Sequence, residues 1–372
     1  MVAQWFAMNL LESRINLDAI AHNTATLKRL VAPAKLMCVL KADAYNHGAV
    51  AVAPVMEAAG ADAFGVATME EAHALLDAGV QVPITCWLWS PTQDPAAVLD
   101  AGITLAVASK SQAERVIAHG RGRVVIKVDT GMHRSGLIED DWHEVMTDLH
   151  NSNVDVQGLM SHFALADDPA QPLTGAQVRK FEQAIALGRS IGLELACNHI
   201  ANSPAALNIP EARFDMVRAG LSLFGEEPVV GEDHGLQPAL RWVGTVTMTK
   251  PVSKGAGVSY GHTWHAPEEG VIAVVSAGYA DGLPRSAQGH LEVAINGQRY
   301  PQVGRVCMDQ FLIYLGDNPK DVRAGEEVEI LGGQATAVSE LAASMGTINY
   351  EVMCMLGGRT RRVYSGGVKG EK

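Results

Sequence analysis

A lysine stands at the end of a short apolar segment near the start of the chain. Residues 37–40 are apolar, and Lys41 follows them directly in the stretch MCVLKADAYNHG. An ammonium group loses hydration at the end of a buried strand, so an unpartnered lysine is uncommon there. The same loss lowers the pKa of the amine and suits it to Schiff-base chemistry with an aldehyde cofactor. A solvated lysine at a strand edge is the alternative, which the surrounding residues must decide.

Two further charged groups occur on the strand-like run RVVIKVD, residues 123–129. Because side chains alternate along a strand, Lys127 and Asp129 share one face and can line the interior of a barrel. An internal ion pair between them is the structural alternative. The glycine-containing loop DTGMHRSG then places Arg134 beyond the strand, where a guanidinium can bind a carboxylate in fork geometry.

Three later strand-like runs also end in polar residues. His162 follows one of them in MSHFA, and alone it is more typical of a satisfied structural histidine than of a base. Asn202 and Ser203 precede Pro204 at a helix start, which suits helix capping as well as phosphate binding. Arg218 lies inside the apolar run DMVRAGLSLFG, and a buried arginine keeps its proton and therefore needs partners.

The elements that must position these residues form a repeating pattern. Eight apolar runs alternate with helix-like segments between about residues 35 and 225, which predicts a (β/α)8 TIM barrel. The runs are MCVLKAD, ADAFGVAT, VPITCWLW, GITLAVAS, RVVIKVD, VDVQGLMSHF, LELACNHIA and DMVRAGLSLF. The residues Lys41, Tyr45, Lys127, Arg134, His162, Asn202, Ser203, Arg218 and Gly220 all fall at the C-terminal ends of these runs, where barrel active sites lie. A doubly wound sheet is the alternative, but its glycine-rich dinucleotide fingerprint is missing.

The pattern of strand-like and helix-like segments changes near residue 235. Short strand runs such as GVIAVVSAG, FLIYLG and EEVEILGG follow, separated by Gly, Pro, Asn and Asp. We therefore expect a barrel domain over residues 1–235, whose first residues can pair with the second domain. The second domain, over residues 236–372, is predicted to be mostly β.

Composition narrows the class of protein. The chain has 372 residues and a net charge of −12, with no basic stripe, which argues against nucleic acid as a partner. Its five cysteines form no CxxC pair, so neither a metal site nor a disulfide framework is expected. No apolar stretch reaches membrane-spanning length, and the first residues lack the features of a signal peptide. We expect a cytoplasmic protein that uses neither metal nor membrane.

Nine short strings, in order and spread over almost the whole chain, resemble those of the alanine racemase family. They are KADAYNHG, KVDTGMHRSG, SHFA, NSPAAL, VRAGLSLFG, VSYGHTW, GYADGLPR, GRVCMDQ and NYEVMC. The resemblance implies an enzyme of fold type III that depends on pyridoxal 5'-phosphate (PLP) and interconverts L- and D-alanine for peptidoglycan metabolism. It also implies a homodimer whose subunits share their active sites around a small amino-acid substrate.

The resemblance assigns roles to individual residues. Lys41 matches the lysine that binds the cofactor and serves as one catalytic base, and Tyr260 matches the opposite base, supplied across the subunit boundary. Arg218 matches the arginine that faces the pyridine nitrogen, and His162 links it to Tyr260. The cofactor-binding set is Lys41, Tyr45, His162, Asn202, Ser203, Arg218, Gly220, Leu221 and Tyr350, of which Tyr45, Ser203, Gly220 and Tyr350 match phosphate-binding positions. The remaining matches are Arg134, Met308 and Asp309 as substrate-binding residues, Tyr279 as a further residue that narrows substrate access, and Lys127 as a carbamate-bearing lysine.

Some positions depart from the family pattern. Asn46 stands where glycine is usual, and asparagine tolerates a left-handed turn. Ala219 and Phe224 replace a common proline and tyrosine, and GGRTRRVYSG is an irregular ending.

Three alternative functions stay open. A serine or broad-specificity racemase would share the whole pattern, because pocket width depends on side-chain packing. A fold-type III decarboxylase shares the lysine, but the chain lacks the GxxCES string typical of that group. A protein that only carries the cofactor is disfavoured by Tyr260 and the full β domain.

Overall fold

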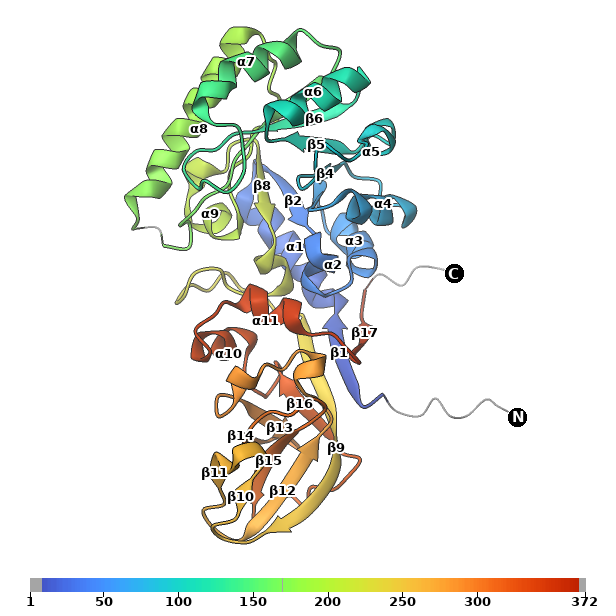
Figure 1. Cartoon of the computed structure of the whole chain (residues 1–372), viewed down its shortest axis with the longest axis vertical. Coiled ribbons are helices and arrows are strands. Elements are labelled where there is room, and N and C mark those ends of the chain that lie inside the picture. Colours follow the sequence, from blue (N-terminus) through green and yellow to red (C-terminus); the bar gives the residue numbers. More distant parts are fainter. Residues whose placement is uncertain (1–8, 169, 368–372) are drawn as a thin grey trace, which may run out of the picture. The chain divides into compact units, whose positions relative to one another are not determined.

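The computed structural model describes residues 9–168 and 170–367 (Figure 1). They form two compact units, which are described separately. The barrel unit contains residues 18–44 and 48–237, and the C-terminal unit contains residues 9–17, 45–47 and 238–367. Within the described residues, no helix is both long enough and apolar enough to cross a membrane.

Parallel strands form the centre of the barrel unit. In chain order they are β2 (Lys35–Val39), β3 (Ala63–Val66), β4 (Ile84–Cys86), β5 (Thr104–Val107), β6 (Arg123–Lys127), β7 (Asp155–Met160) and β8 (Met216–Ala219). Their order in the sheet is β7-β6-β5-β4-β3-β2-β8. Seven of the eight predicted runs thus contain a regular parallel strand.

The remaining predicted run, LELACNHIA, closes the barrel without forming a regular strand. The His199 backbone N–H donates to the Leu159 carbonyl at 2.9 Å on one side, and the Arg218 backbone N–H donates to the Ala201 carbonyl at 2.9 Å on the other. Residues 197–201 therefore occupy the place of a strand between β7 and β8. The (β/α)8 barrel predicted from the sequence is confirmed.

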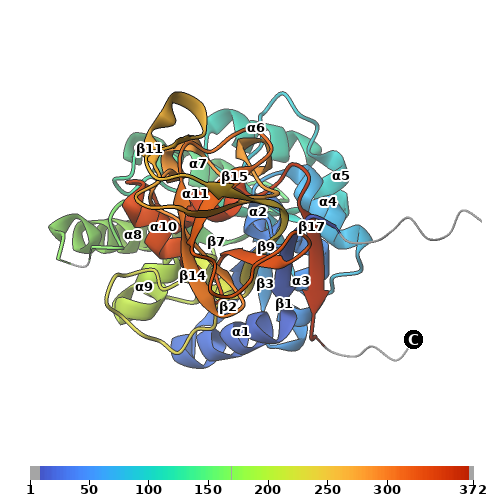
Figure 2. The ribbon, with the colours of Figure 1, turned by 90° about the horizontal axis from the view of Figure 1, so that it is seen from below.

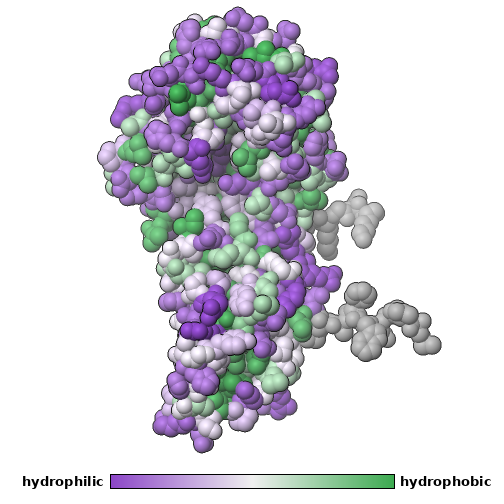
Figure 3. Space-filling model, viewed as in Figure 1, coloured by the Kyte–Doolittle hydropathy of each residue, from purple (hydrophilic) through white to green (hydrophobic). Residues whose placement is uncertain are grey.

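Helices cover the outside of the barrel strands (Figure 2). They are α1 (Leu17–Val31), α3 (Ala49–Ala58), α4 (Met69–Asp77), α5 (Ala96–Asp100), α6 (Lys110–His119), α7 (Glu139–His150), α8 (Pro172–Ile191) and α9 (Ser203–Asn208). Local signals set several of their ends: Thr68 and Glu71 form a capping box at the start of α4, and the left-handed Gly120 ends α6. Hydrophilic residues cover much of the outer face of this helical layer (Figure 3).

The C-terminal unit is built on a largely antiparallel sheet with the order β12-β15-β14-β13-β16-β9-β1-β17. Its strands are β1 (Leu11–Asn16), β9 (Leu240–Val252), β12 (Gly270–Val275), β13 (Glu292–Ile295), β14 (Gln298–Val303), β15 (Phe311–Gly316), β16 (Glu327–Leu331) and β17 (Arg361–Ser365). The short strands β10 (Gly257–Val258) and β11 (Trp264–His265) pair separately, and the helices are α10 (Val338–Ser344) and α11 (Asn349–Met355). The Asn296-Gly297 pair has positive φ at both residues and makes the tight β13–β14 hairpin. A second domain that is mostly β is confirmed.

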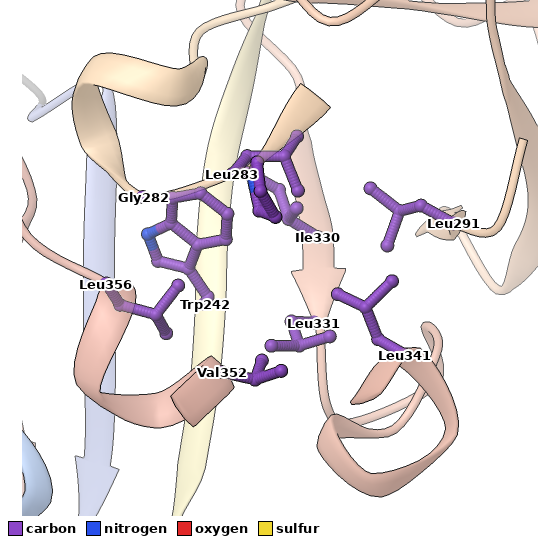
Figure 4. Close-up of a pocket in the computed structure, with 10 residues that line it drawn as sticks. Trp242, Gly282, Leu283, Leu291, Ile330, Leu331, Leu341, Val352 and Leu356 are labelled. Atoms are coloured by element: carbon purple, nitrogen blue, oxygen red, sulfur yellow. The ribbon is translucent and has the colours of Figure 1, made fainter. Parts of the chain in front are cut away.

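A small apolar pocket lies inside the C-terminal unit (Figure 4). Its lining residues are Trp242, Gly282, Leu283, Pro284, Leu291, Ile330, Leu331, Leu341, Val352 and Leu356. None of these side chains titrates or acts as a nucleophile. The pocket is therefore a gap in the hydrophobic core and does not provide a site for chemistry.

Candidate active site

Lys41 begins a backbone turn of unusual hand. The segment α2 (Lys41–Tyr45) follows β2, and φ lies between 52° and 68° from Ala42 to Asn46. Left-handed backbone costs about 1–2 kcal/mol per non-glycine residue, so the surrounding structure must hold this turn. The Ala42 N–H donates to Glu71 Oε1 at 2.6 Å, and the Asp43 carboxylate accepts from the Ala49 N–H at 2.7 Å. The expected left-handed Asn46 is confirmed, whereas the turn as a whole was not predicted.

Arg218 organises the buried side of the barrel mouth. Its side chain is buried, and its two Nη atoms donate to three carbonyl oxygens, those of Ser161, His199 and Ile200. They also lie 3.0 Å from His162 Nδ1 and 2.9 Å from His199 Nδ1. Because arginine has no acceptor, both Nδ1 atoms must accept, which assigns the ring proton of each neutral histidine to Nε2. The expected contact between Arg218 and His162 is present, and His199 is an additional partner.

The charges at this cluster follow from burial. Burial together with Arg218 lowers the pKa of His162 and that of His199 well below the usual value, so both rings are neutral at pH 7. Burial and the nearby Arg134 lower the pKa of Arg218 to about 9, which leaves its guanidinium charged at neutral pH. Within the described residues Arg218 Nε makes no hydrogen bond and remains a cationic donor.

Lys127 is a buried amine among other cations. Its side chain is 8% exposed and forms neither a hydrogen bond nor an ion pair with the described residues. Burial, Arg218 and Arg134 lower its pKa to about 8. Asp129 does not pair with it, because its carboxylate accepts the backbone N–H groups of Gly131 at 3.0 Å and His133 at 3.1 Å. The internal ion pair considered as an alternative is thus not formed.

Ser203 and Gly220 converge at two helix starts. Asn202 caps α9, its Oδ1 accepting the Ala205 N–H at 3.3 Å, so its capping role is confirmed. Ser203 Oγ accepts the Gly220 N–H at 2.9 Å, which leaves the serine proton free to be donated. Leu221 begins the 3-10 turn η2 (Leu221–Phe224) directly after Gly220. Hydroxyl and backbone donors at helix N-termini form a set suited to a phosphate.

The other predicted residues belong to the C-terminal unit. Tyr45 is buried, and its ring centroid lies 5.9 Å from that of Tyr350 on α11. Burial, Tyr350 and Cys354 raise the pKa of Tyr45, so its hydroxyl stays protonated and able to donate.

Tyr260 projects from the surface of the same unit. Its side chain is 69% exposed on the 3-10 turn η3 (Tyr260–His262). Ser259, immediately before it, has φ 63° and donates from Oγ to the Arg305 carbonyl at 2.7 Å. That bond ties the Tyr260 turn to the loop that carries Met308, which is also exposed. Asp309 accepts a hydrogen bond from Arg359, a residue to which no sequence motif assigns a role.

The closed parallel barrel, the second β unit and the polar and cationic residues at the strand ends are typical of an enzyme whose active site lies at a barrel mouth. Residues 15–228 match the alanine racemase N-terminal domain, and residues 239–364 match the alanine racemase C-terminal domain. The chain belongs to the alanine racemase family.

Named relatives agree in length and fold. An alanine racemase of Corynebacterium efficiens is 55% identical over 365 residues, which cover 96% of this chain and 99% of the relative. The crystal structure of alanine racemase from Corynebacterium glutamicum superposes with a TM-score of 0.88 at 48% identity, covering 96% of this chain and 100% of that one. An alanine racemase from Bartonella henselae, solved with covalently bound pyridoxal phosphate, has a TM-score of 0.88 at 27% identity, with coverage of 96% and 100%.

Proposed function

We propose that this chain is a PLP-dependent racemase that interconverts L- and D-alanine with two bases, Lys41 and the partner's Tyr260. The observation that carries the proposal is Arg218, a charged arginine with one donor left over, held between two neutral histidines at the mouth of the barrel. The 55% identity to a named alanine racemase over nearly the whole chain supports the same reaction.

The donor set of the barrel unit fits PLP. The cofactor has an aldehyde, a phosphate and a pyridine nitrogen, each of which needs a different partner. Lys41 supplies an amine for the aldehyde, and the Ser203 hydroxyl and the backbone N–H groups at the start of η2 supply donors for the phosphate. Arg218 Nε supplies the donor for the pyridine nitrogen. We assign Tyr45 and Tyr350 to the phosphate and Asn202 to the support of Ser203.

Two bases follow from the stereochemistry of racemisation. Bound PLP acidifies the Cα–H bond of the amino acid by conjugation. Inversion then requires proton removal on one face and proton return on the other, which Lys41 Nζ and the partner's Tyr260 Oη perform in either order. Arg218 remains cationic and would donate to the pyridine nitrogen of bound PLP, which would leave that nitrogen unprotonated and suppress side reactions such as transamination. His162, with its proton on Nε2, links Arg218 by hydrogen bonds to the phenol of the partner's Tyr260.

Arg134 and a carbamate on Lys127 complete the substrate site in this proposal. An amine of pKa about 8 is partly uncharged at neutral pH and can add carbon dioxide. The nitrogen bonds to the carbon of carbon dioxide and releases a proton, so an ammonium cation becomes a carbamate anion. This anion would pair with Arg134 and orient its guanidinium toward the substrate carboxylate and a cofactor oxygen.

We further propose a cytoplasmic homodimer in which Tyr260, Met308, Asp309 and Tyr279 serve the partner's active site. The strong exposure of Tyr260 in its own chain supports this arrangement, because a catalytic phenol needs a desolvated setting. The D-alanine formed would serve peptidoglycan metabolism.

The test follows the optical activity of L-alanine, L-serine and L-lysine with purified protein and added PLP by circular dichroism. We expect the L-alanine signal to decay toward zero, with the other amino acids slower. Lys41→Ala should abolish both the decay and the absorbance of covalently bound cofactor, while Lys35→Ala, at an exposed lysine of β2, should change neither. Faster decay of L-serine would favour a serine or broad-specificity racemase, and release of carbon dioxide would favour a decarboxylase. Protein that stays colourless with PLP would refute the proposal.

A further inference from the structure

Two loops of the C-terminal unit carry exposed residues next to acidic ones. The Tyr279 loop (residues 277–283) contains Tyr279 and, two positions later, Asp281; the Met308 loop (residues 304–310) contains Met308 and then Asp309. Tyr279 and Met308 are 44% and 53% exposed, whereas the Asp281 side chain is only 1% exposed. Each loop therefore presents one large side chain and has one carboxylate close to it.

Backbone hydrogen bonds join the two loops. The Tyr279 N–H donates to the Cys307 carbonyl and the Ala280 N–H to the Met308 carbonyl, both at 3.0 Å. Gly278 permits this approach, because a Cβ at that position would lie 2.2 Å from the Met308 carbonyl oxygen. A displacement of either loop must therefore move the other.

Arg359 joins the two carboxylates from a third segment, just before β17. Its Nε and Nη2 bind the two oxygens of Asp281 at 2.8 and 2.7 Å, and its backbone N–H donates to the same carboxylate at 3.2 Å. Its remaining arm, Nη1, donates to Asp309 Oδ1 at 2.7 Å. All three groups of the guanidinium are thus used.

The two halves of this clamp have different physical consequences. Burial alone would raise the pKa of Asp281, but hydrogen bonds from Arg359 and the Gly278 N–H hold it below its usual value, so the buried carboxylate is charged and depends on Arg359. The Asp309 half is solvent-exposed, with 56% of the Arg359 and 63% of the Asp309 side chain accessible. Exposed ion pairs stabilise proteins little, so this arm mainly restricts the place of Asp309 and of Met308 beside it.

We propose that Arg359 is a positioning residue that sets the affinity for alanine and the preference for alanine over larger amino acids. It acts by fixing the positions of Met308 and Asp309 relative to Tyr279. The inference rests on the proposed function, in which these three residues narrow substrate access and contact the substrate in the partner's site. Nothing in the proton-transfer steps involves Arg359 itself, so its effect should appear in KM more than in kcat.

The decisive variant is Arg359→Lys. A lysine keeps a cation beside buried Asp281 but lacks the fork that also reaches Asp309. We expect a melting temperature close to that of the wild type, a KM for L-alanine raised about tenfold and a kcat changed by less than about twofold. The ratio of kcat/KM for alanine to that for serine should fall. Amide hydrogen exchange should become faster in residues 304–310. Arg361→Lys, at an exposed arginine two positions along that forms no side-chain hydrogen bond with the described residues, should change none of these values.

Several outcomes would overturn the inference. Unchanged KM in an Arg359→Lys protein that is folded and binds PLP would exclude a positioning role, as would activity lost only in proportion to bound cofactor. Unchanged hydrogen exchange in residues 304–310 would show that no clamp exists, whether or not the protein racemises alanine. A wild type that shows this clamp by hydrogen exchange but does not racemise alanine would instead refute the proposed function, and with it the stated effect on KM.

Discussion

The barrel unit and the C-terminal unit hold their candidate functional residues in opposite ways. In the barrel unit Arg218 and Lys127 are 5% and 8% exposed, and strand-end carbonyls and histidine rings surround the arginine. In the C-terminal unit Tyr260 is 69% exposed, and the loops that bear it and Met308 are fixed by backbone bonds, a serine and Arg359.

This difference separates two tasks. Burial lets the barrel unit set the protonation states of its own groups, because desolvation and neighbouring cations act strongly there. Tyr260 and Met308 of the C-terminal unit are exposed instead, so in the proposed function they act only when a second surface covers them. Removal of the Tyr260 hydroxyl should therefore alter turnover and leave the electrostatics of the barrel unit intact.

The largest expected effect is that of Tyr260→Phe. Removal of a catalytic acid–base group costs about 10²–10⁴-fold in rate, so racemisation should fall by that factor while the cofactor absorbance is retained. Tyr314→Phe, at a tyrosine of β15 in the same unit, is the matched control and should keep normal turnover. Normal turnover in Tyr260→Phe would show that the exposed tyrosine is not a base.

The second prediction concerns the pH dependence of stability. Because His162 and His199 stay neutral in the folded state, the unfolded chain binds more protons below about pH 6.5. The free energy of unfolding should therefore fall as the pH falls, by up to about 1.4 kcal/mol per pH unit for each histidine. Urea unfolding at several pH values below about 6.5 measures how steeply the free energy of unfolding changes with pH. His199→Gln should reduce this pH dependence by the contribution of one proton. An identical slope in the variant would show that His199 is not held neutral by its burial beside Arg218.

A smaller effect is expected at Lys127. Lys127→Ala removes the proposed carbamate and the alignment of Arg134, and KM for alanine should rise about tenfold, equivalent to about 1.4 kcal/mol. Carbon-13 NMR with labelled bicarbonate should show a carbamate signal in the wild type that is absent from the variant. Full activity in carbon dioxide-free buffer, with native mass spectrometry showing a bare amine, would contradict the carbamate.

The smallest predicted effect is that of Asn46→Gly, which compares side-chain hydrogen bonding with backbone strain at one residue. Its side chain donates to the Leu356 carbonyl and accepts from Arg362, while its backbone has φ 68°. Asn46→Gly relieves the strain of the left-handed backbone, but it removes both side-chain hydrogen bonds and increases the conformational entropy of the unfolded chain. We therefore expect the free energy of unfolding to fall by about 0.5–1 kcal/mol. Asn46→Ala keeps the unfavourable backbone as well and should lose about 1–2 kcal/mol in the same urea unfolding. A more stable Asn46→Gly would show that the side-chain bonds contribute nothing.

Much of the barrel and its candidate site followed from local pattern. Apolar runs of strand length between amphipathic helices predict a parallel barrel, and the barrel places the C-terminal end of every strand at one mouth. That rule alone grouped Lys41, Lys127, His162 and Arg218. In the structure Arg218 lies within hydrogen-bonding distance of His162, and burial together with cations that include Arg218 and Lys41 lowers the pKa of Lys127.

Other features did not follow from local pattern because they depend on contacts between distant residues. Alanine disfavours left-handed backbone, so the Lys41 turn depends on bonds such as that from Ala42 to Glu71, 29 positions away. Lys127 and Asp129 share a strand face, yet the aspartate binds its own loop instead. Arg359 belongs to a stretch with no recognisable sequence pattern, and its partner Asp281 lies 78 positions earlier.

By itself the sequence determined the order of the elements, the family and the residue types available for chemistry, since periodicity and short motifs are local properties of the chain. Only the tertiary structure decided the state of those residues. Whether a histidine is neutral, a lysine unpaired or an arginine divided between two carboxylates depends on burial and on neighbours brought together by folding. The free energies of charged groups and of hydrogen bonds depend on the distances between the groups and on the local dielectric constant. Both are set only when the chain folds.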